Sequence, residues 1–79
     1  MLSLNYDNKF DVLYISFGHP RDSYGEEDIP HVVTLKDITT NEITGYTIMG
    51  YKELLKTGEL FNLPLEDVDF RRDVLPFVQ

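Results

Sequence analysis

Apolar and polar side chains alternate with a period of two along residues 2–17, and this alternation constrains the fold more than any other feature of the chain. In residues 2–6, Ser3 and Asn5 separate apolar side chains that would share one side of an extended strand. Residues 11–17 repeat the pattern, although their second face is only half polar. That strand would carry Leu13, Ile15 and Phe17 on one face and Val12, Tyr14 and Ser16 on the other. The chain therefore predicts a sheet with one well-buried face.

Three further strands are expected before residue 50. Residues 21–28 are polar and acidic, which favours a short edge strand whose charges discourage pairing with other sheets. Residues 31–36 and 43–49 predict a hairpin that follows Pro30 and is joined by turn formers at residues 37–42. We expect Val33 and Leu35 to face the core and Val32 to face away. For residues 43–49, the sequence does not decide which alternate residues face inward.

The pattern changes after Gly50. Tyr51, Leu54 and Leu55 fall at i, i+3 and i+4, which predicts a short amphipathic helix ended by Gly58. A helix of two turns is not stable alone, so it must pack on the sheet. In the tail, residues 62–64 are expected to start a helical turn, and residues 66–75 are expected to form a second short helix ended by Pro76.

Together these elements predict an α+β fold: a small antiparallel β-sheet of four to five strands, in a meander, with a short C-terminal helix packed on one face. The chain is expected to be a single domain over residues 1–79, with the sheet in 1–49 and a helical part in 50–79. The core is predicted to consist of Leu4, Leu13, Ile15, Val33, Leu35, Ile48, Leu54 and Leu55.

One helix cannot cover both faces of such a sheet. The second face is predicted to be apolar enough to require a cover, which points to a dimer or another partner. Five tyrosines favour an interface, although strands are rich in aromatics in any case. The interface predicted on this face comprises Val12, Tyr14, Val32 and Tyr46.

Composition narrows the class of partner. The 79 residues include 14 acidic and 7 basic side chains, for a formal net charge of -7, and no cysteine. An acidic field repels nucleic acid and favours a basic protein partner. The chain has no apolar run long enough to span a membrane and no recognisable signal peptide, so a cytoplasmic protein without membrane contact is expected. Chains this short often need extra burial, which a homo-oligomer would supply.

Candidate sites for chemistry are few. His19 and His31 with the acidic residues 26–28 would be the metal-binding candidates, but a spacing of twelve residues matches no compact ligand pattern. Residues 37–42 loosely follow a calcium loop but are better explained as turn formers. Asp7 and Asp11 bracket the first turn, where Asp7 is expected to cap the turn and Asp11 to be solvated at the start of a strand. We therefore expect no catalytic residue, no metal and no cofactor.

Two segments resemble a known family. Residues 6–15 read Tyr-Asp-Asn-Lys-Phe-Asp-Val-Leu-Tyr-Ile, and residues 42–48 read Glu-Ile-Thr-Gly-Tyr-Thr-Ile. They resemble motifs of the short prokaryotic family called domain of unknown function 2283. The resemblance implies a small sheet-based fold, no assigned activity, and an antitoxin-like or accessory role beside small toxin-like proteins. It carries over no catalytic residue.

The sequence thus favours a non-catalytic interaction module that works as a homodimer, as the partner of a small basic protein, or as both. The alternative is a small metal-dependent enzyme that uses His19, His31 and the acidic loop near them. A purely structural component of an assembly is a third hypothesis, which the sequence does not separate from the first.

Overall fold

The computed structural model describes residues 2–65 and 67–78. Five strands come first and helical segments follow. The strands are β1 (Leu2–Asp7), β2 (Val12–Phe17), β3 (Ser23–Ile29), β4 (Val32–Asp37) and β5 (Ile43–Met49), and the helical segments are α1 (Tyr51–Thr57), η1 (Glu59–Asn62) and η2 (Phe70–Val74).

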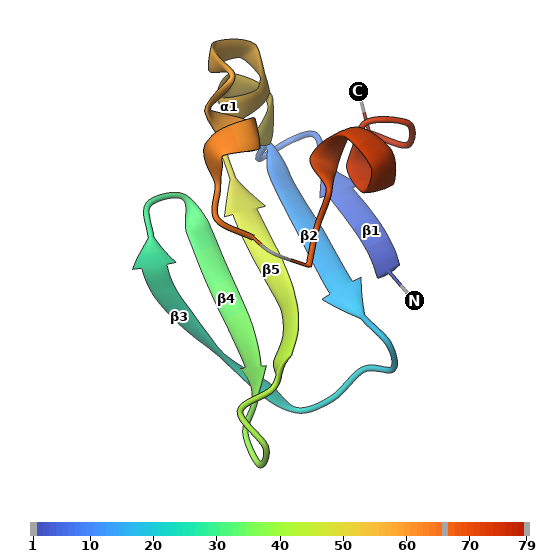
Figure 1. Cartoon of the computed structure of the whole chain (residues 1–79), viewed down its shortest axis with the longest axis vertical. Helices are drawn as coiled ribbons and strands as arrows, with labels where there is room; N and C mark the ends of the chain where they lie inside the picture. The colour runs from blue at the N-terminus through green and yellow to red at the C-terminus, as the bar shows by residue number, and fades with distance from the viewer. Residues whose placement is uncertain (1, 66, 79) are drawn as a thin grey trace.

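All neighbouring strands are antiparallel, and their order in the sheet is β1-β2-β5-β4-β3. The β1–β2 hairpin and the β3–β4–β5 meander join where β2 pairs with β5, so the segment after β2 crosses the end of the sheet to reach β3 at the far edge (Figure 1). The predicted α+β class is confirmed, with a short helix packed on an antiparallel sheet. The acidic segment is an edge strand, as expected.

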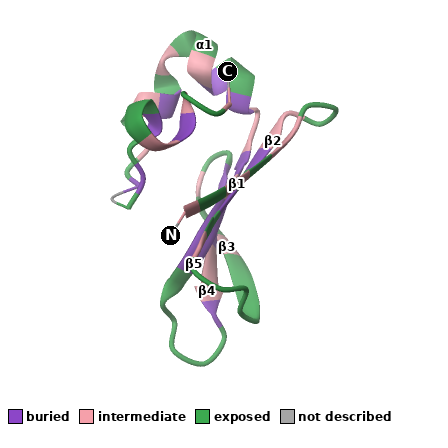
Figure 2. Ribbon diagram, turned by 90° about the vertical axis from the view of Figure 1, so that its right-hand side faces the viewer, coloured by how far each residue is buried: buried purple, intermediate pink, exposed green. Residues whose placement is uncertain are grey.

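The helical segments lie on one face of the sheet, over the end nearest α1, and we call this face the covered face (Figure 2). Leu13, Ile15 and Ile48 on this face are at most 1% exposed, and fully burying one such side chain contributes about 2 kcal/mol. The tail supplies a large part of the core, a contribution that the sequence did not predict. Its buried side chains are Leu60, Leu65, Val68, Phe70 and Val74.

Strand β4 corrects the predicted core. Val32 pairs with Ile48 on the covered face and is 0% exposed, whereas Val33 and Leu35 lie on the opposite face. The prediction was wrong because it followed the two apolar residues Val33 and Leu35, whereas pairing with β5 places the alternate residues, Val32 and Thr34, on the covered face. A shift of one residue exchanges the two faces of a strand.

The same register corrects the predicted interface. Tyr46 pairs with Ile15 on the covered face, is 4% exposed, and packs edge-on against Phe17 with ring centroids 5.9 Å apart. Val32 is buried on that face too, so neither residue can form an interface on the other side. Val12 and Tyr14 do lie on the uncovered face, as predicted.

The predicted first helix is confirmed as α1. Gly58 ends it in the left-handed conformation with φ 85°, which glycine adopts without steric cost. Tyr51 is 0% exposed, and its hydroxyl donates a 2.8 Å hydrogen bond to the carbonyl of Val78 near the end of the described chain. Burial of this kind, together with capping, holds so short a helix in place.

The tail differs from its prediction. A 3₁₀ turn, η1, ends at Asn62, and Leu63 is extended because the following Pro64 disfavours the helical conformation before it. The second helix is only the π-type turn η2, which begins where the Asp69 carboxylate accepts the backbone N–H groups of Arg71 and Arg72. Glu66, the first residue of the predicted helix, lies outside the described residues. No helix in the described part of the chain is long and apolar enough to cross a membrane.

Candidate interaction surface

The face of the sheet opposite the helical layer, which we call the open face, carries a band of apolar side chains. Tyr14 on β2 is 43% exposed, and its neighbours in the band are partly exposed. Register places the members on the three adjacent strands β2, β5 and β4, with Thr47 of β5 between Tyr14 and Val33. The band consists of Val12, Tyr14, Val33, Leu35 and Met49.

Two glycines shape this surface around Leu35, which pairs with Gly45 on β5 and with Gly25 on β3. A Cβ on Gly45 would collide with the backbone carbonyl of Ile15, so the strands approach closely only because no side chain is present there. A Cβ on Gly25 would lie 2.7 Å from Cγ1 of Val33. The glycines therefore leave the Leu35 side chain between them without a side-chain neighbour on either paired position.

Acidic side chains flank the band at both edges of the sheet. Asp7 on β1 pairs with Val12, and the exposed residues Glu27 and Asp28 lie in the β-bulge of β3 opposite the Val33 position. An apolar centre with a charged border is the usual anatomy of a protein interface. The border here is negative, in keeping with the net charge of -7.

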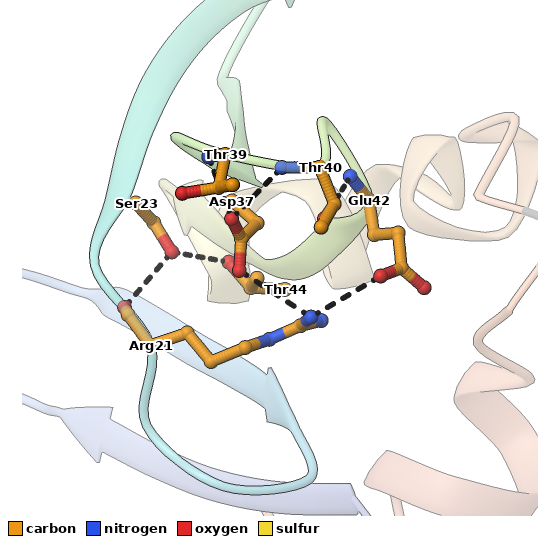
Figure 3. Close-up of polar contacts among 7 residues, drawn as sticks. All are labelled: Arg21, Ser23, Asp37, Thr39, Thr40, Glu42 and Thr44. Atoms are coloured by element: carbon orange, nitrogen blue, oxygen red, sulfur yellow. Dashed lines mark hydrogen bonds and ion pairs between the residues drawn. The ribbon is translucent and has the colours of Figure 1, made fainter.

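At one end of the sheet, a polar cluster ties the β4–β5 loop to the crossover segment (Figure 3). The Asp37 carboxylate is largely buried and accepts the backbone N–H groups of Thr39 and Thr40 at 2.7 and 3.0 Å. The Arg21 guanidinium lies 3.4 Å from Asp37 and 3.4 Å from Glu42. The two loop N–H groups, and then Arg21, lower the pKa of Asp37. The ionised carboxylate therefore stabilises the β4–β5 loop.

Two hydroxyl groups complete that cluster. The Ser23 hydroxyl donates to the carbonyl of Arg21 at 3.0 Å, and it shares a 2.8 Å hydrogen bond with the hydroxyl of Thr44 (Figure 3). Beside them is a hollow of about 290 Å³, lined in part by His19, Arg21 and Leu35. Arg21, Ser23, Asp37 and Thr44 each already have a partner within the protein, which gives the cluster a structural role.

Asp11 has a role that the sequence did not reveal. It adopts a left-handed conformation with φ 56°, and its carboxylate accepts the Tyr6 hydroxyl at 2.6 Å. The same carboxylate accepts the backbone N–H of Lys52 at 3.0 Å, and its own carbonyl accepts the N–H groups of Gly50 and Tyr51. Asp11 therefore caps the first turn of α1 from the β1–β2 turn, instead of being solvated as predicted.

The electrostatics of this contact follow from its geometry. Burial opposes ionisation of Asp11, but hydrogen bonds from Tyr6 and from the N–H groups of Lys52 and Glu53 outweigh it and lower the pKa of the carboxyl. The hydrogen bond to Asp11 is the main cause that raises the pKa of Tyr6 to about 12. Asp7 caps the β1–β2 turn, as predicted, by accepting the N–H groups of Lys9 and Phe10.

The structure separates the two histidines. His19 follows β2 at one end of the sheet, while His31 lies in the β3–β4 turn at the other end, where its carbonyl accepts the N–H of Met49. They cannot share one ion, so the metal site imagined for the pair is wrong. Among residues 2–65 and 67–78, no group of three or more metal-ligating side chains comes together.

No protein-family model matches the chain, and no curated protein and no solved structure is detectably similar to it. The resemblance noted for residues 6–15 and 42–48 therefore stays a prediction. The structure nevertheless explains the residues that carry it: Tyr6 and Asp11 attach α1, Asp7 caps a turn, and Gly45 permits close strand packing.

Proposed function

We propose that this protein is a non-catalytic interaction module, and that its open face binds a small basic protein. One observation carries the proposal: an apolar band crosses three strands of a five-stranded sheet that is covered on one side only. Larger contiguous apolar patches on small domains mark interaction sites. The conspicuous polar side chains, by contrast, are engaged in internal hydrogen bonds, as for Asp11 and Asp37.

The charge distribution supports a basic partner over a neutral one. The open face is bordered by Asp7, Glu27 and Asp28, and the chain carries twice as many acidic as basic residues (14 against 7). Such a field accelerates encounter with a basic surface and makes the association rate fall as salt is added. An antitoxin-like or accessory role beside a small basic protein is consistent with this chemistry.

Tyr14 is the residue on which to test the proposal, because it is an aromatic and the most exposed member of the band. Tyr14→Arg should leave the fold intact and weaken binding of the partner by about 2 kcal/mol, or roughly thirtyfold in Kd. Wild-type and variant baits would capture the partner from the native host, and calorimetry with the purified pair would then measure Kd at low and high salt.

Phe10→Arg provides a matched control. Phe10 is 68% exposed in the β1–β2 turn, away from the band, so this variant makes the same change in charge at an aromatic position outside the proposed surface. We expect it to bind as wild type does. Equal binding by Tyr14→Arg and wild type would place the contact elsewhere, and recovery of the bait alone would count against a basic partner.

A further inference from the structure

The two edges of the sheet differ in how they are protected, and the difference points to self-association. Strand β3 carries Glu26, Glu27 and Asp28 in succession and has a β-bulge between Glu26 and Ile29. Charges and bulges are devices that keep an edge strand from pairing with another sheet. β1, at the opposite edge, has a regular register with β2 and a single charge, Asp7 at its end (Figure 1).

The backbone of β1 is open on its outer side. The strand pairs with β2 alone, and among residues 2–65 and 67–78 no backbone hydrogen bond joins it to any other segment. Alternate N–H and C=O groups along its outer side are thus available to a further strand. Unpaired groups of this kind are a template for β-strand addition.

A groove with both apolar and charged lining runs beside this edge on the covered-face side. Its volume is about 540 Å³, and it is lined by Leu2 and Leu4 of β1 and by Arg72, Asp73 and Phe77 of the tail. Phe77 is 75% exposed, which is high for a phenylalanine next to two partly exposed leucines. A strand added to β1 would place every second side chain over this groove.

We propose that β1 pairs antiparallel with β1 of a second copy, giving a two-fold symmetric dimer with a continuous ten-stranded sheet. β1 is self-complementary in the register centred on Leu4. In this register Leu4 lies opposite Leu4 of the second copy, Leu2 opposite Tyr6, and Ser3 opposite Asn5. Apolar side chains therefore pair with apolar ones, and polar side chains with polar ones.

Charge also selects the second copy as the occupant. The Leu4-centred pairing leaves Asp7, the one charged side chain of β1, outside the paired residues, so no like charges face each other across the new ladder. Pairing of β3 with β3 would oppose two acidic strands. Because β3 is blocked in this way, the association closes as a dimer and does not extend into a filament. The dimer keeps the open face accessible and does not depend on the partner proposed for it.

The register allows a test by charge exchange. Ser3 and Asn5 are exposed, so substitutions there should be compatible with the fold. In the double variant Ser3→Lys/Asn5→Lys, like charges face each other twice, and in Ser3→Glu/Asn5→Glu they do so again. Mixing the two variants places a lysine opposite a glutamate at both positions, which should restore pairing.

Sedimentation equilibrium measures the result. Wild type should have twice the 9.2 kDa mass of the chain, each double variant should have half the wild-type mass, and the equimolar mixture should return to the dimer. Asn8→Lys/Asn62→Lys, which changes two exposed asparagines elsewhere by the same total charge, should remain dimeric. A monomeric wild type, lysine variants that stay dimeric, or a mixture that stays monomeric would overturn the proposal.

Amide hydrogen exchange of the unmodified protein gives a second readout, which holds even if a variant fails to fold. On dilution from the dimeric to the monomeric range, exchange in residues 2–7 should accelerate while exchange in β3 stays constant. Unchanged protection of residues 2–7, or equal changes at both edges, would also refute pairing through β1.

Discussion

The central strands of the sheet carry apolar side chains on both faces, but the two faces serve different ends. On the covered face, Leu13 and Ile48 are fully buried, whereas on the open face Val33 is partly exposed, as is Leu35 between two glycines. Hydrophobicity alone does not distinguish the two sets. The position of the tail makes one face a core and leaves the other free for a partner.

The largest expected effect concerns burial on the two faces. Leu13→Ala should lower the free energy of unfolding by about 3 kcal/mol, because it leaves a cavity in a packed core. Leu35→Ala removes the same atoms from the open face and should cost about 1 kcal/mol, since water already reaches that side chain. Urea denaturation of the two variants checks the comparison. Equal losses would mean that the open face is packed as tightly as the core.

A smaller effect on stability is expected at the contact between Asp11 and the start of α1. Asp11→Ala should destabilise the protein by about 2 kcal/mol, because it removes the cap of α1 and places alanine in a left-handed conformation. Asp11→Gly also removes the cap but adopts that conformation freely, so it should cost about 1 kcal/mol. Thermal unfolding monitored by circular dichroism separates the two contributions. If both variants were as stable as wild type, Asp11 would not hold the helix.

The smallest effect is the pH dependence of the stability that the Tyr6–Asp11 hydrogen bond provides. Folding lowers the pKa of Asp11. Its contribution to the free energy of unfolding is therefore complete above its unfolded pKa of about 3.9, and it is lost as the pH falls through the folded pKa. Folding raises the pKa of Tyr6 to about 12. Its contribution to the free energy of unfolding is therefore complete below about pH 10, and it is lost as the pH rises through the folded pKa.

Tyr6→Phe isolates this dependence. The difference in unfolding free energy between wild type and Tyr6→Phe should be constant from about pH 5 to 9 and should narrow at both extremes. Tyr24→Phe is the control for the acid side, because the Tyr24 hydroxyl donates to the uncharged side-chain oxygen of Asn41. Denaturant melts across pH provide the measurement. A difference that stays constant in acid would show that the Tyr6–Asp11 hydrogen bond does not depend on the carboxylate charge.

The exposed face of a strand was predicted correctly for β2, where Leu13, Ile15 and Phe17 make one set of alternate residues uniformly apolar. Tyr14 was placed on the open face because β2 has its strongest apolar residues on the other parity. For β4 and β5 both parities contain apolar residues, and two of the four predicted interface residues, Val32 and Tyr46, were assigned to the wrong face. The cap by Asp11 escaped prediction because it joins residues 41 positions apart, and no local pattern records such a contact.

By itself, the sequence determined the element types up to residue 58: period-two alternation specified strands, i, i+3, i+4 spacing specified α1, and Asp7 and Gly58 specified where a hairpin turns and where α1 ends. These signals are local, since they depend on backbone preferences and on neighbours along the chain. Tertiary structure alone decided the strand order, the face that β4 and β5 bury, and the contribution of the tail to the core. Those choices depend on pairing and packing between distant residues, where several arrangements satisfy the same local pattern.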